Sequence, residues 1–181
     1  FTEYQRHQAW TWEHQALTRA RVVAGPTALA ERFRAIRQDV LEPARDPVIL
    51  RQEVCEMRER MRGELDASTT EVFDLKQGRG GIADIEFMVQ YGVLANASRY
   101  PDLLIYPDNI RQLDGLERFG VLSIADAARL RHAYRVLRRR IHQLKLQEQP
   151  ARIPVNEAQD ERESVIRVWR RLMEGDRSPV H

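Results

Sequence analysis

The chain has 181 residues, of which 43% are hydrophobic, 31% charged and 7% aromatic. This composition excludes collagen-like, low-complexity and largely disordered proteins, and the length predicts one domain of ordinary size. The 29 basic and 27 acidic residues leave a net charge of +2, which gives little support for nucleic acid as a partner. No apolar stretch approaches the roughly 20 residues of a membrane span, so we expect no membrane partner.

Cysteine content and the first residues indicate the setting of the protein. Cys55 is the only cysteine, which argues against a disulfide framework or a cysteine zinc site and fits a reducing compartment. We therefore expect a cytoplasmic protein. The start lacks an initiator methionine and the pattern of a signal peptide, so we interpret the chain as a piece of a longer protein.

Apolar residues recur with helical spacing between proline, glycine and aspartate breaks, which predicts an all-α helical bundle over residues 1–175 and a frayed tail over 176–181. About six or seven helices are expected. Their approximate ranges are 3–23, 28–41, 47–65, 82–97, 109–119, 124–147 and 157–174.

The junctions between these helices carry recognisable signals. Thr27, Asp46, Asp108 and Ser123 each precede a helical pattern and are predicted N-caps. Between the third and fourth helices, Val72, Phe73 and Leu75 indicate a short extended piece, and residues 78–81 a flexible glycine-rich turn. Pro150 and Pro154 predict a linker.

The predicted helix 82–97 is apolar around nearly its whole axis and should be central. Glu86 and Gln90 lie one turn apart on the same stripe, whereas Asp84 points roughly the opposite way. Because burying an unpaired charge is costly, Glu86 either meets an arginine inside the domain or faces a polar cleft shared with another domain or a ligand. Asp84 and Glu86 form a D-x-E pair, but they diverge by about 200° on a helix, so no metal site is predicted there.

Residues 76–81, KQGRGG, lead directly into that helix. Free N–H groups and the helix dipole at such a position favour an anion such as phosphate. The loop lacks the pattern of a Walker A or dinucleotide-binding motif. A phosphate-contacting loop and a simple tight turn both remain open.

The predicted helix 124–147 has an apolar stripe and, on another face within about 100°, a basic stripe. The basic stripe consists of Arg131, Arg135, Arg138, Arg139 and His142. It could hold phosphate or an acidic partner. The alternative is a solvated face whose arginines pair with the glutamates of helix 47–65.

Two stretches carry a family resemblance: residues 9–21, AWTWEHQALTRAR, and residues 73–87, FDLKQGRGGIADIEF. Together they strongly resemble bacterial glutamine synthetase adenylyltransferases, in which each of two nucleotidyltransferase halves is followed by a helical bundle. The form WEHQA resembles the C-terminal, adenylylating half. The resemblance implies a complete enzyme that uses ATP and Mg²⁺ to transfer AMP to a tyrosine of glutamine synthetase, with PII signalling protein as a further partner and glutamine as an effector.

The catalytic pattern of that family, a Gly-Ser turn followed by a strand bearing D-x-D, is absent from this sequence. The resemblance therefore implies that the metal-binding carboxylates lie in an upstream nucleotidyltransferase domain, and that this chain alone has no catalytic or metal-binding residue and is inactive. Its helices would pack on that domain and close one wall of the nucleotide cleft. The residues expected nearest the cleft are Lys76, Gly80, Gly81, Asp84, Glu86 and Gln90.

Two alternatives remain. The related uridylyltransferase that modifies PII protein shares the segment GGIxDIE, although the stretch WEHQAL favours the adenylylating enzyme. Alternatively, the helices form a docking module with no role in the active site, and the basic stripe from Arg131 to His142 binds glutamine synthetase or PII protein.

Overall fold

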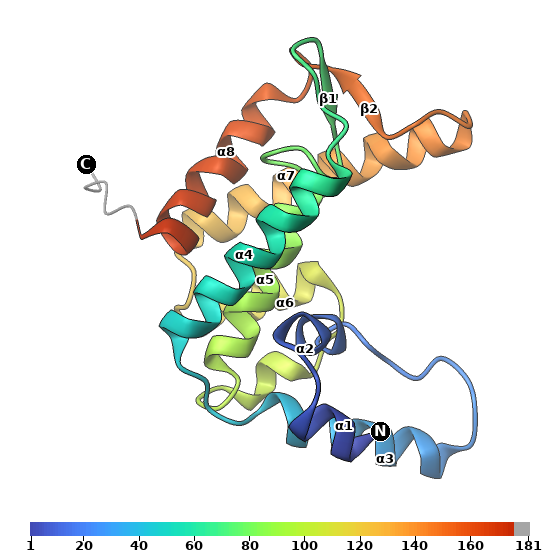
Figure 1. The fold of residues 1–181 in the computed structure, drawn as a ribbon, viewed down its shortest axis with the longest axis vertical. Coiled ribbons are helices and arrows are strands. Elements are labelled where there is room, and N and C mark those ends of the chain that lie inside the picture. The colour runs from blue at the N-terminus through green and yellow to red at the C-terminus, as the bar shows by residue number, and fades with distance from the viewer. Residues whose placement is uncertain (176–181) are drawn as a thin grey trace. The chain divides into compact units, whose positions relative to one another are not determined.

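A computed structural model describes residues 1–175. They form the eight helices α1 to α8 and a single two-stranded antiparallel sheet, so the predicted all-α class is confirmed (Figure 1). Contacts divide the chain into two compact units, residues 1–54 with 89–122, and residues 55–88 with the chain from 123 onward. No helix in the described part of the chain is long and apolar enough to cross a membrane.

The first unit is built from helices that bury an aliphatic core. Its elements are α1 (Thr2–His7), α2 (Thr11–Leu17), α3 (Thr27–Leu41), the start of α4 (Pro47–Leu65), the end of α5 (Ile82–Asn96), a short 3-10 helix η1 (Pro101–Leu104) and α6 (Asn109–Arg118). Both α1 and α2 contact α3. Leu41, Val54, Val93, Leu113 and Leu116 are fully buried in this core.

The predicted helix 3–23 is wrong, because the chain forms two short helices there and leaves helical geometry after Leu17. Trp10 has an extended backbone, and its N–H donates to Glu13 Oε2 at 2.9 Å, which starts a new helix. At the other end, the Thr18 hydroxyl donates to the Gln15 carbonyl oxygen at 2.7 Å. Hydrogen bonds of side chains to the backbone have replaced the continuous helical ladder.

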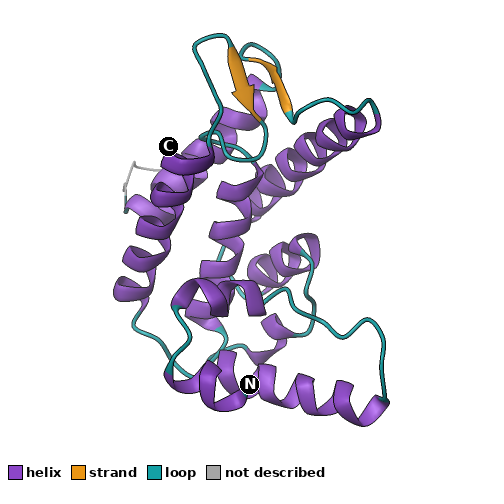
Figure 2. Cartoon of the chain, turned by 45° about the vertical axis from the view of Figure 1, so that its right-hand side comes forward, coloured by secondary structure: helices purple, strands orange, loops and turns teal. Residues whose placement is uncertain are grey.

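The second unit combines the two strands with the two C-terminal helices. Its elements are the end of α4, β1 (Val72–Asp74), the start of α5, α7 (Ile124–Leu146), β2 (Arg152–Pro154), α8 (Gln159–Trp169) and a π-helical turn η2 (Arg170–Glu174). The strands are drawn in orange in Figure 2. Helices α7 and α8 pack on each other. The apolar side chains of the sheet, Phe73 and Ile153, are buried.

The linker expected between Pro150 and Pro154 is instead the second strand. Phe73 of β1 is paired with Ile153 of β2, and the two side chains are 0% and 3% exposed. Proline is tolerated in β2 because an edge strand does not need every N–H for pairing. The short alternation of one buried residue between two exposed ones was too brief to be recognised from the sequence.

Three of the four predicted N-caps are confirmed. Asp46 Oδ1 accepts bonds from the N–H groups of Val48 and Ile49, Asp108 Oδ1 accepts one from Arg111, and Ser123 Oγ accepts one from Asp126. The fourth, Thr27, is the first residue of α3 rather than its cap. The expected helix 157–174 begins two residues later and changes to a π-helical turn after Trp169, and the expected frayed tail lies outside the described residues.

Candidate functional site

The buried carboxylate of Asp84 connects the glycine-rich loop to two helices of the second unit. Asp84 lies in the first turn of α5 and is 1% exposed. Its Oδ2 accepts a hydrogen bond from the Gly80 N–H at 2.7 Å. Its Oδ1 accepts bonds from Arg58 Nε at 2.7 Å and from Arg62 Nη2 at 2.8 Å, both from α4. Both carboxylate oxygens are therefore engaged by groups of the protein.

Arg58 is the second buried member of this network, and its side chain is 0% exposed. It also donates to the Gln77 carbonyl oxygen at 2.8 Å and to Gln77 Oε1 at 3.3 Å. At Arg62, burial opposes the charged form, but the charges of Asp84 and Glu59 raise the pKa of the guanidinium. Ion pairs without water persist only when their remaining donors and acceptors are satisfied, so this network fixes the loop on α4.

The loop also requires glycine where it approaches α8. Gly80 has φ of +85°, and a Cβ atom there would lie 2.7 Å from the Cγ and carbonyl oxygen of Arg162. Arg162 Nε in turn donates to the carbonyl oxygen of Arg79 at 3.1 Å, and its guanidinium lies over the Phe73 ring. The segment expected to be a flexible turn is thus packed between β1 and α8.

Most backbone N–H groups of the loop already have acceptors inside the protein. Those of Lys76 and Gln77 donate to Asp74 Oδ1, and those of Gly78, Gly81, Ile82 and Ala83 donate to the carbonyl oxygens of Asp74, Gly78, Leu75 and Lys76. A phosphate bound by this helix N-terminus would need the same groups. The geometry therefore favours the tight turn over a phosphate cradle made by the backbone.

The six predicted cleft residues have different surroundings in the structure. Gly80, Gly81 and Asp84 lie together in the network, Lys76 is exposed on the loop, and Glu86 is half-buried on α5. Gln90 belongs to the first unit, where its Oε1 accepts a bond from Gln15 Nε2 at 3.0 Å. The fully buried carboxylate of this helix is Asp84, whereas Glu86, expected either to meet an arginine or to face a polar cleft, is half-buried. The position of Asp84 in the first turn lets it reach back to the Gly80 N–H, a contact that helical periodicity does not reveal.

Sequence reasoning missed Arg58, although a signal was present. Leu50, Val54 and Arg58 follow one another at intervals of four residues and are all buried. An arginine in the third place of an apolar stripe indicates a buried guanidinium and calls for a carboxylate elsewhere. The Arg- and Glu-rich composition of α4 hid this stripe.

The predicted basic stripe lies on α7. Arg135, Arg138, Arg139 and His142 are exposed, whereas Arg131 is half-buried and is engaged within the protein. Arg138 donates to the Tyr134 hydroxyl at 3.1 Å.

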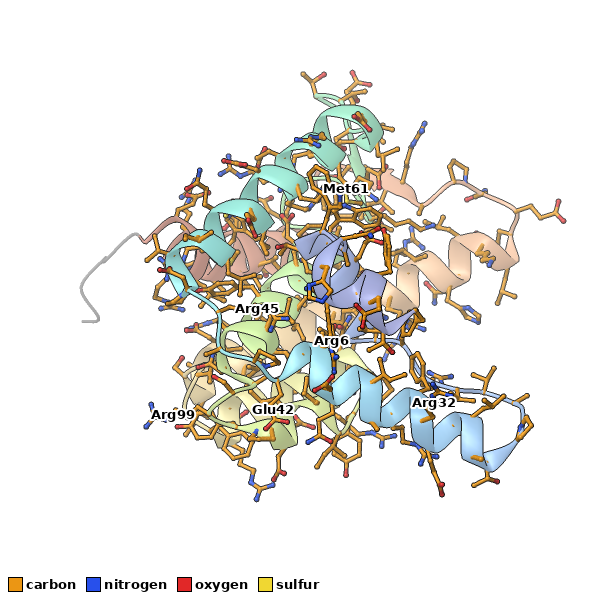
Figure 3. The ribbon with its side chains drawn as sticks, turned by 60° about the horizontal axis from the view of Figure 1, so that its bottom comes forward. Arg6, Arg32, Glu42, Arg45, Met61 and Arg99 are labelled. Carbon is orange, nitrogen blue, oxygen red and sulfur yellow. The ribbon has the colours of Figure 1, made fainter. Side chains whose placement is uncertain are left out.

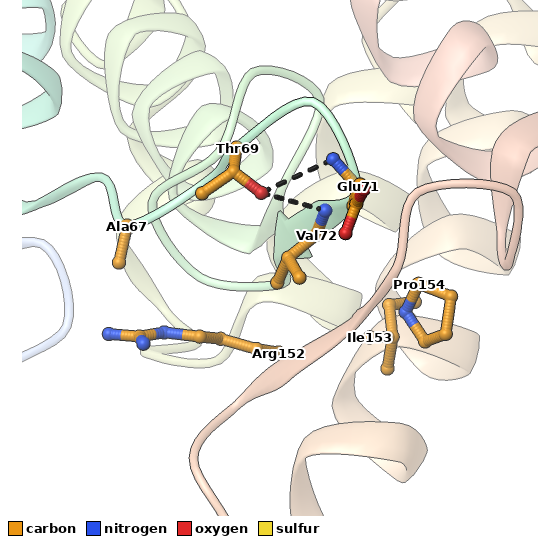
Figure 4. A pocket seen from close by; sticks show the side chains of 7 residues that line it. All are labelled: Ala67, Thr69, Glu71, Val72, Arg152, Ile153 and Pro154. Atoms are coloured by element: carbon orange, nitrogen blue, oxygen red, sulfur yellow. Dashed lines mark hydrogen bonds between the residues drawn. The ribbon is translucent and has the colours of Figure 1, made fainter.

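A hollow of about 610 Å³ lies beside the small sheet. Figure 4 shows the side chains that line it. Its lining is mainly aliphatic, with Arg152 and Glu71 as the charged groups, and Thr69 Oγ1 accepts bonds from the N–H groups of Glu71 and Val72. None of the predicted site residues lines it. In residues 1–175 no group of three or more His, Cys, Asp or Glu side chains could hold a metal ion.

Comparison with known families now defines the class of this helical arrangement. The family model described as GlnD PII-uridylyltransferase matches residues 49–167, which include both the Asp84 network and the basic stripe. The chain belongs to that family. A second family model, described as glutamate-ammonia ligase adenylyltransferase, matches residues 1–36.

The relatives narrow the class. Bifunctional glutamine synthetase adenylyltransferase/adenylyl-removing enzymes are 52% identical in Nitrosococcus oceani and 54% identical in Thioalkalivibrio sulfidiphilus, each over 96% of the chain. The enzyme of the same name from Hahella chejuensis is 46% identical over 95%. The expected resemblance to glutamine synthetase adenylyltransferases is confirmed. The stretch that the uridylyltransferase model matches, residues 49–167, therefore also occurs in proteins named as glutamine synthetase adenylyltransferases. The chain spans 18% of the length of these relatives.

Proposed function

We propose that the chain is the helical part of a cytoplasmic glutamine synthetase adenylyltransferase, and that the complete protein uses ATP and Mg²⁺ to transfer AMP to a tyrosine of glutamine synthetase. The observation that carries this proposal is identity of 46% to 54% over nearly the whole chain with proteins of that name. PII signalling protein is the proposed regulatory partner.

Within that enzyme the helical part packs on the upstream nucleotidyltransferase domain and presents the loop of residues 76–81 to the cleft. Support comes from the rigidity of the loop, since the Asp84 ion pair and the Gly80 contact with α8 hold it in one conformation. A rigid loop holds the backbone of the exposed Lys76 and the half-buried Glu86 in fixed positions. No conformational entropy then has to be lost to order the loop when the reaction takes place. Asp84 and Arg58 are positioning residues in this proposal.

The test uses the complete enzyme and measures incorporation of labelled AMP into purified glutamine synthetase. Lys76→Ala and Glu86→Gln should each lower the adenylylation rate by roughly tenfold, because positioning is worth that much or more, while the thermal unfolding temperature stays unchanged. Arg32→Ala, an exposed arginine of α3, is the matched control and should behave as wild type. If neither variant differs from the control, the cleft-facing role is wrong.

A second candidate is transfer of UMP to PII protein, which the description of the family model over residues 49–167 favours. The same complete protein should then label PII protein from UTP and leave glutamine synthetase unlabelled. Identity over nearly the entire chain with adenylyltransferases favours the opposite result.

A further inference from the structure

Helix α7 carries a large local excess of positive charge. Residues 124–146 contain six arginines, one lysine and two histidines, but Asp126 is the only acid among them. The chain as a whole has a net charge of only +2. The excess is therefore a property of this helix and not of the composition.

The structure pairs only part of this charge with carboxylates of the protein. Asp126 pairs with Arg129 on α7 and with Arg171 of η2, while Arg140 pairs with Glu157 at 3.0 Å. His132 contacts Glu161 of α8 at 3.3 Å. These pairs involve Arg129, His132 and Arg140 of α7.

Arg131 is also engaged within the protein, and Lys145 lies near the end of the helix. The other four basic side chains form what we call the basic face, Arg135, Arg138, Arg139 and His142. All four side chains are exposed, and within residues 1–175 no carboxylate lies at ion-pair distance from any of the three arginines. Spacings of three and four residues place these groups side by side, where like charges repel by a few tenths of a kcal/mol per pair. The isolated helix is therefore less stable for carrying them.

The helix that carries the basic face is packed on its opposite side, and the face has an apolar end. Leu130, Leu137 and Leu144 on the opposite side of α7 are at most 5% exposed and hold the helix in place. Leu146, three turns from Arg135 and on the same face, is 73% exposed. The face from Arg135 to Leu146 is about 16 Å long.

We propose that the basic face of α7 docks an acidic surface of the protein that the enzyme modifies, with Leu146 as an apolar contact at its end. This inference rests on the proposed function, under which that protein is glutamine synthetase. Charge complementarity decides the class of partner: carboxylates remove the repulsion among the arginines. A nucleic acid is disfavoured because the chain as a whole has a net charge of only +2.

The experiment compares variants of the complete enzyme. Arg135→Glu/Arg139→Glu reverses two charges of the basic face, and Arg135→Gln/Arg139→Gln only removes them. The control is Arg32→Glu/Arg34→Glu on α3, which reverses two exposed arginines of the other unit; Arg32 is labelled in Figure 3. The dissociation constant for glutamine synthetase is measured without nucleotide at low and high salt, and AMP transfer is measured at varied glutamine synthetase concentration.

We expect the reversal to raise Kd and KM for glutamine synthetase by about tenfold or more, the neutral variant to have a smaller effect, and the control to stay within about twofold. At saturating glutamine synthetase kcat should be unchanged, and the salt dependence of binding should weaken. Equal Kd values for glutamine synthetase in the face variants and in the wild type overturn the proposal. If the wild-type enzyme transfers AMP and the reversal variant has the same KM for glutamine synthetase, only the docking proposal is overturned. If the wild-type enzyme neither binds glutamine synthetase nor transfers AMP to it, the proposed function is overturned as well.

Discussion

Within residues 1–175 each unit buries one arginine, and the two are satisfied in different ways. Arg58 in the second unit meets the carboxylate of Asp84 and the carbonyl oxygen of Gln77. Arg37 in the first unit donates instead to three carbonyl oxygens, those of Leu17, Thr18 and Leu104, at 2.9, 2.5 and 2.6 Å. Burial lowers the pKa of Arg37.

The difference shows two ways of holding a guanidinium away from water. Two of the three acceptors, the carbonyl groups of Leu17 and Thr18, lie at the end of α2, where the helix dipole gives the carbonyl groups partial negative charge. Arg37 is therefore held by dipoles alone. Arg58 has a full counter-charge, and its partner also holds a loop that leads into another helix. One arginine completes local structure, whereas the other determines the position of a candidate functional loop.

The largest expected effect comes from removing Arg58. Arg58→Met leaves the Asp84 carboxylate buried with Arg62 as its remaining charged partner, and should lower the free energy of unfolding by about 3–5 kcal/mol. Urea unfolding of the 181-residue chain measures this loss. Arg60→Met on the exposed side of α4 is the control and should change little. The double variant Arg58→Met/Asp84→Leu should recover part of the stability, since no charge is then left unpaired; additive losses would contradict the ion-pair account.

Arg37→Met should cost less, about 2–3 kcal/mol, because it leaves carbonyl acceptors unsatisfied but no buried charge. The loss should be local: hydrogen exchange of the amide groups in α2 should accelerate more than that in α7. The exposed neighbour Arg34 provides the control, as Arg34→Met. If Arg37→Met lowers the free energy of unfolding as much as Arg58→Met does, the proposed difference between the two arginine sites is wrong.

Gly80→Ala tests the loop side of the comparison. The positive φ and the 2.7 Å approach to Arg162 should make this change destabilising by about 1–3 kcal/mol. Gly63 has open space around its Cβ position and lies in α4, so Gly63→Ala should instead stabilise by up to about 1 kcal/mol. Thermal unfolding of the two variants should therefore move in opposite directions, and a shared direction would contradict the close packing of the loop.

The smallest expected effect on stability concerns Glu13 at the start of α2, in the unit that contains Arg37. Hydrogen bonds from the Trp10 N–H and from the Tyr4 hydroxyl lower the pKa of Glu13. A lowered folded pKa stabilises the fold above the unfolded pKa of about 4.3, and this contribution is lost as pH falls through the folded value. The difference in urea midpoint between wild type and Glu13→Gln should thus shrink from pH 6 to pH 3. A difference that stays constant with pH would exclude this linkage.

Sequence analysis anticipated the features that depend on neighbouring residues. The caps Asp46, Asp108 and Ser123 act within three residues of themselves, and the helices that they begin were placed correctly. The break before Thr11 was missed because Trp10 is an unusual N-cap, although Glu13 three residues later carried a signal.

The features that sequence analysis did not anticipate depend on partners far along the chain. Asp84 is buried because Arg58 lies opposite it, and Ile153 forms a strand because Phe73 is its partner. Helical periodicity describes one element at a time and contains no information about these pairings. For the same reason the loop of residues 76–81 was recognised as a candidate site, while the residue that fixes it was not.

The pairing of β1 with β2 has a consequence for synthesis on the ribosome. Phe73 and its partner Ile153 are about eighty residues apart in the chain. At a translation rate of 5–20 residues per second, β1 leaves the ribosome roughly 4–16 s before β2 does. During that interval the ring of Phe73 has no strand beside it, so the nascent chain passes through a state in which chaperone binding has time to compete with folding.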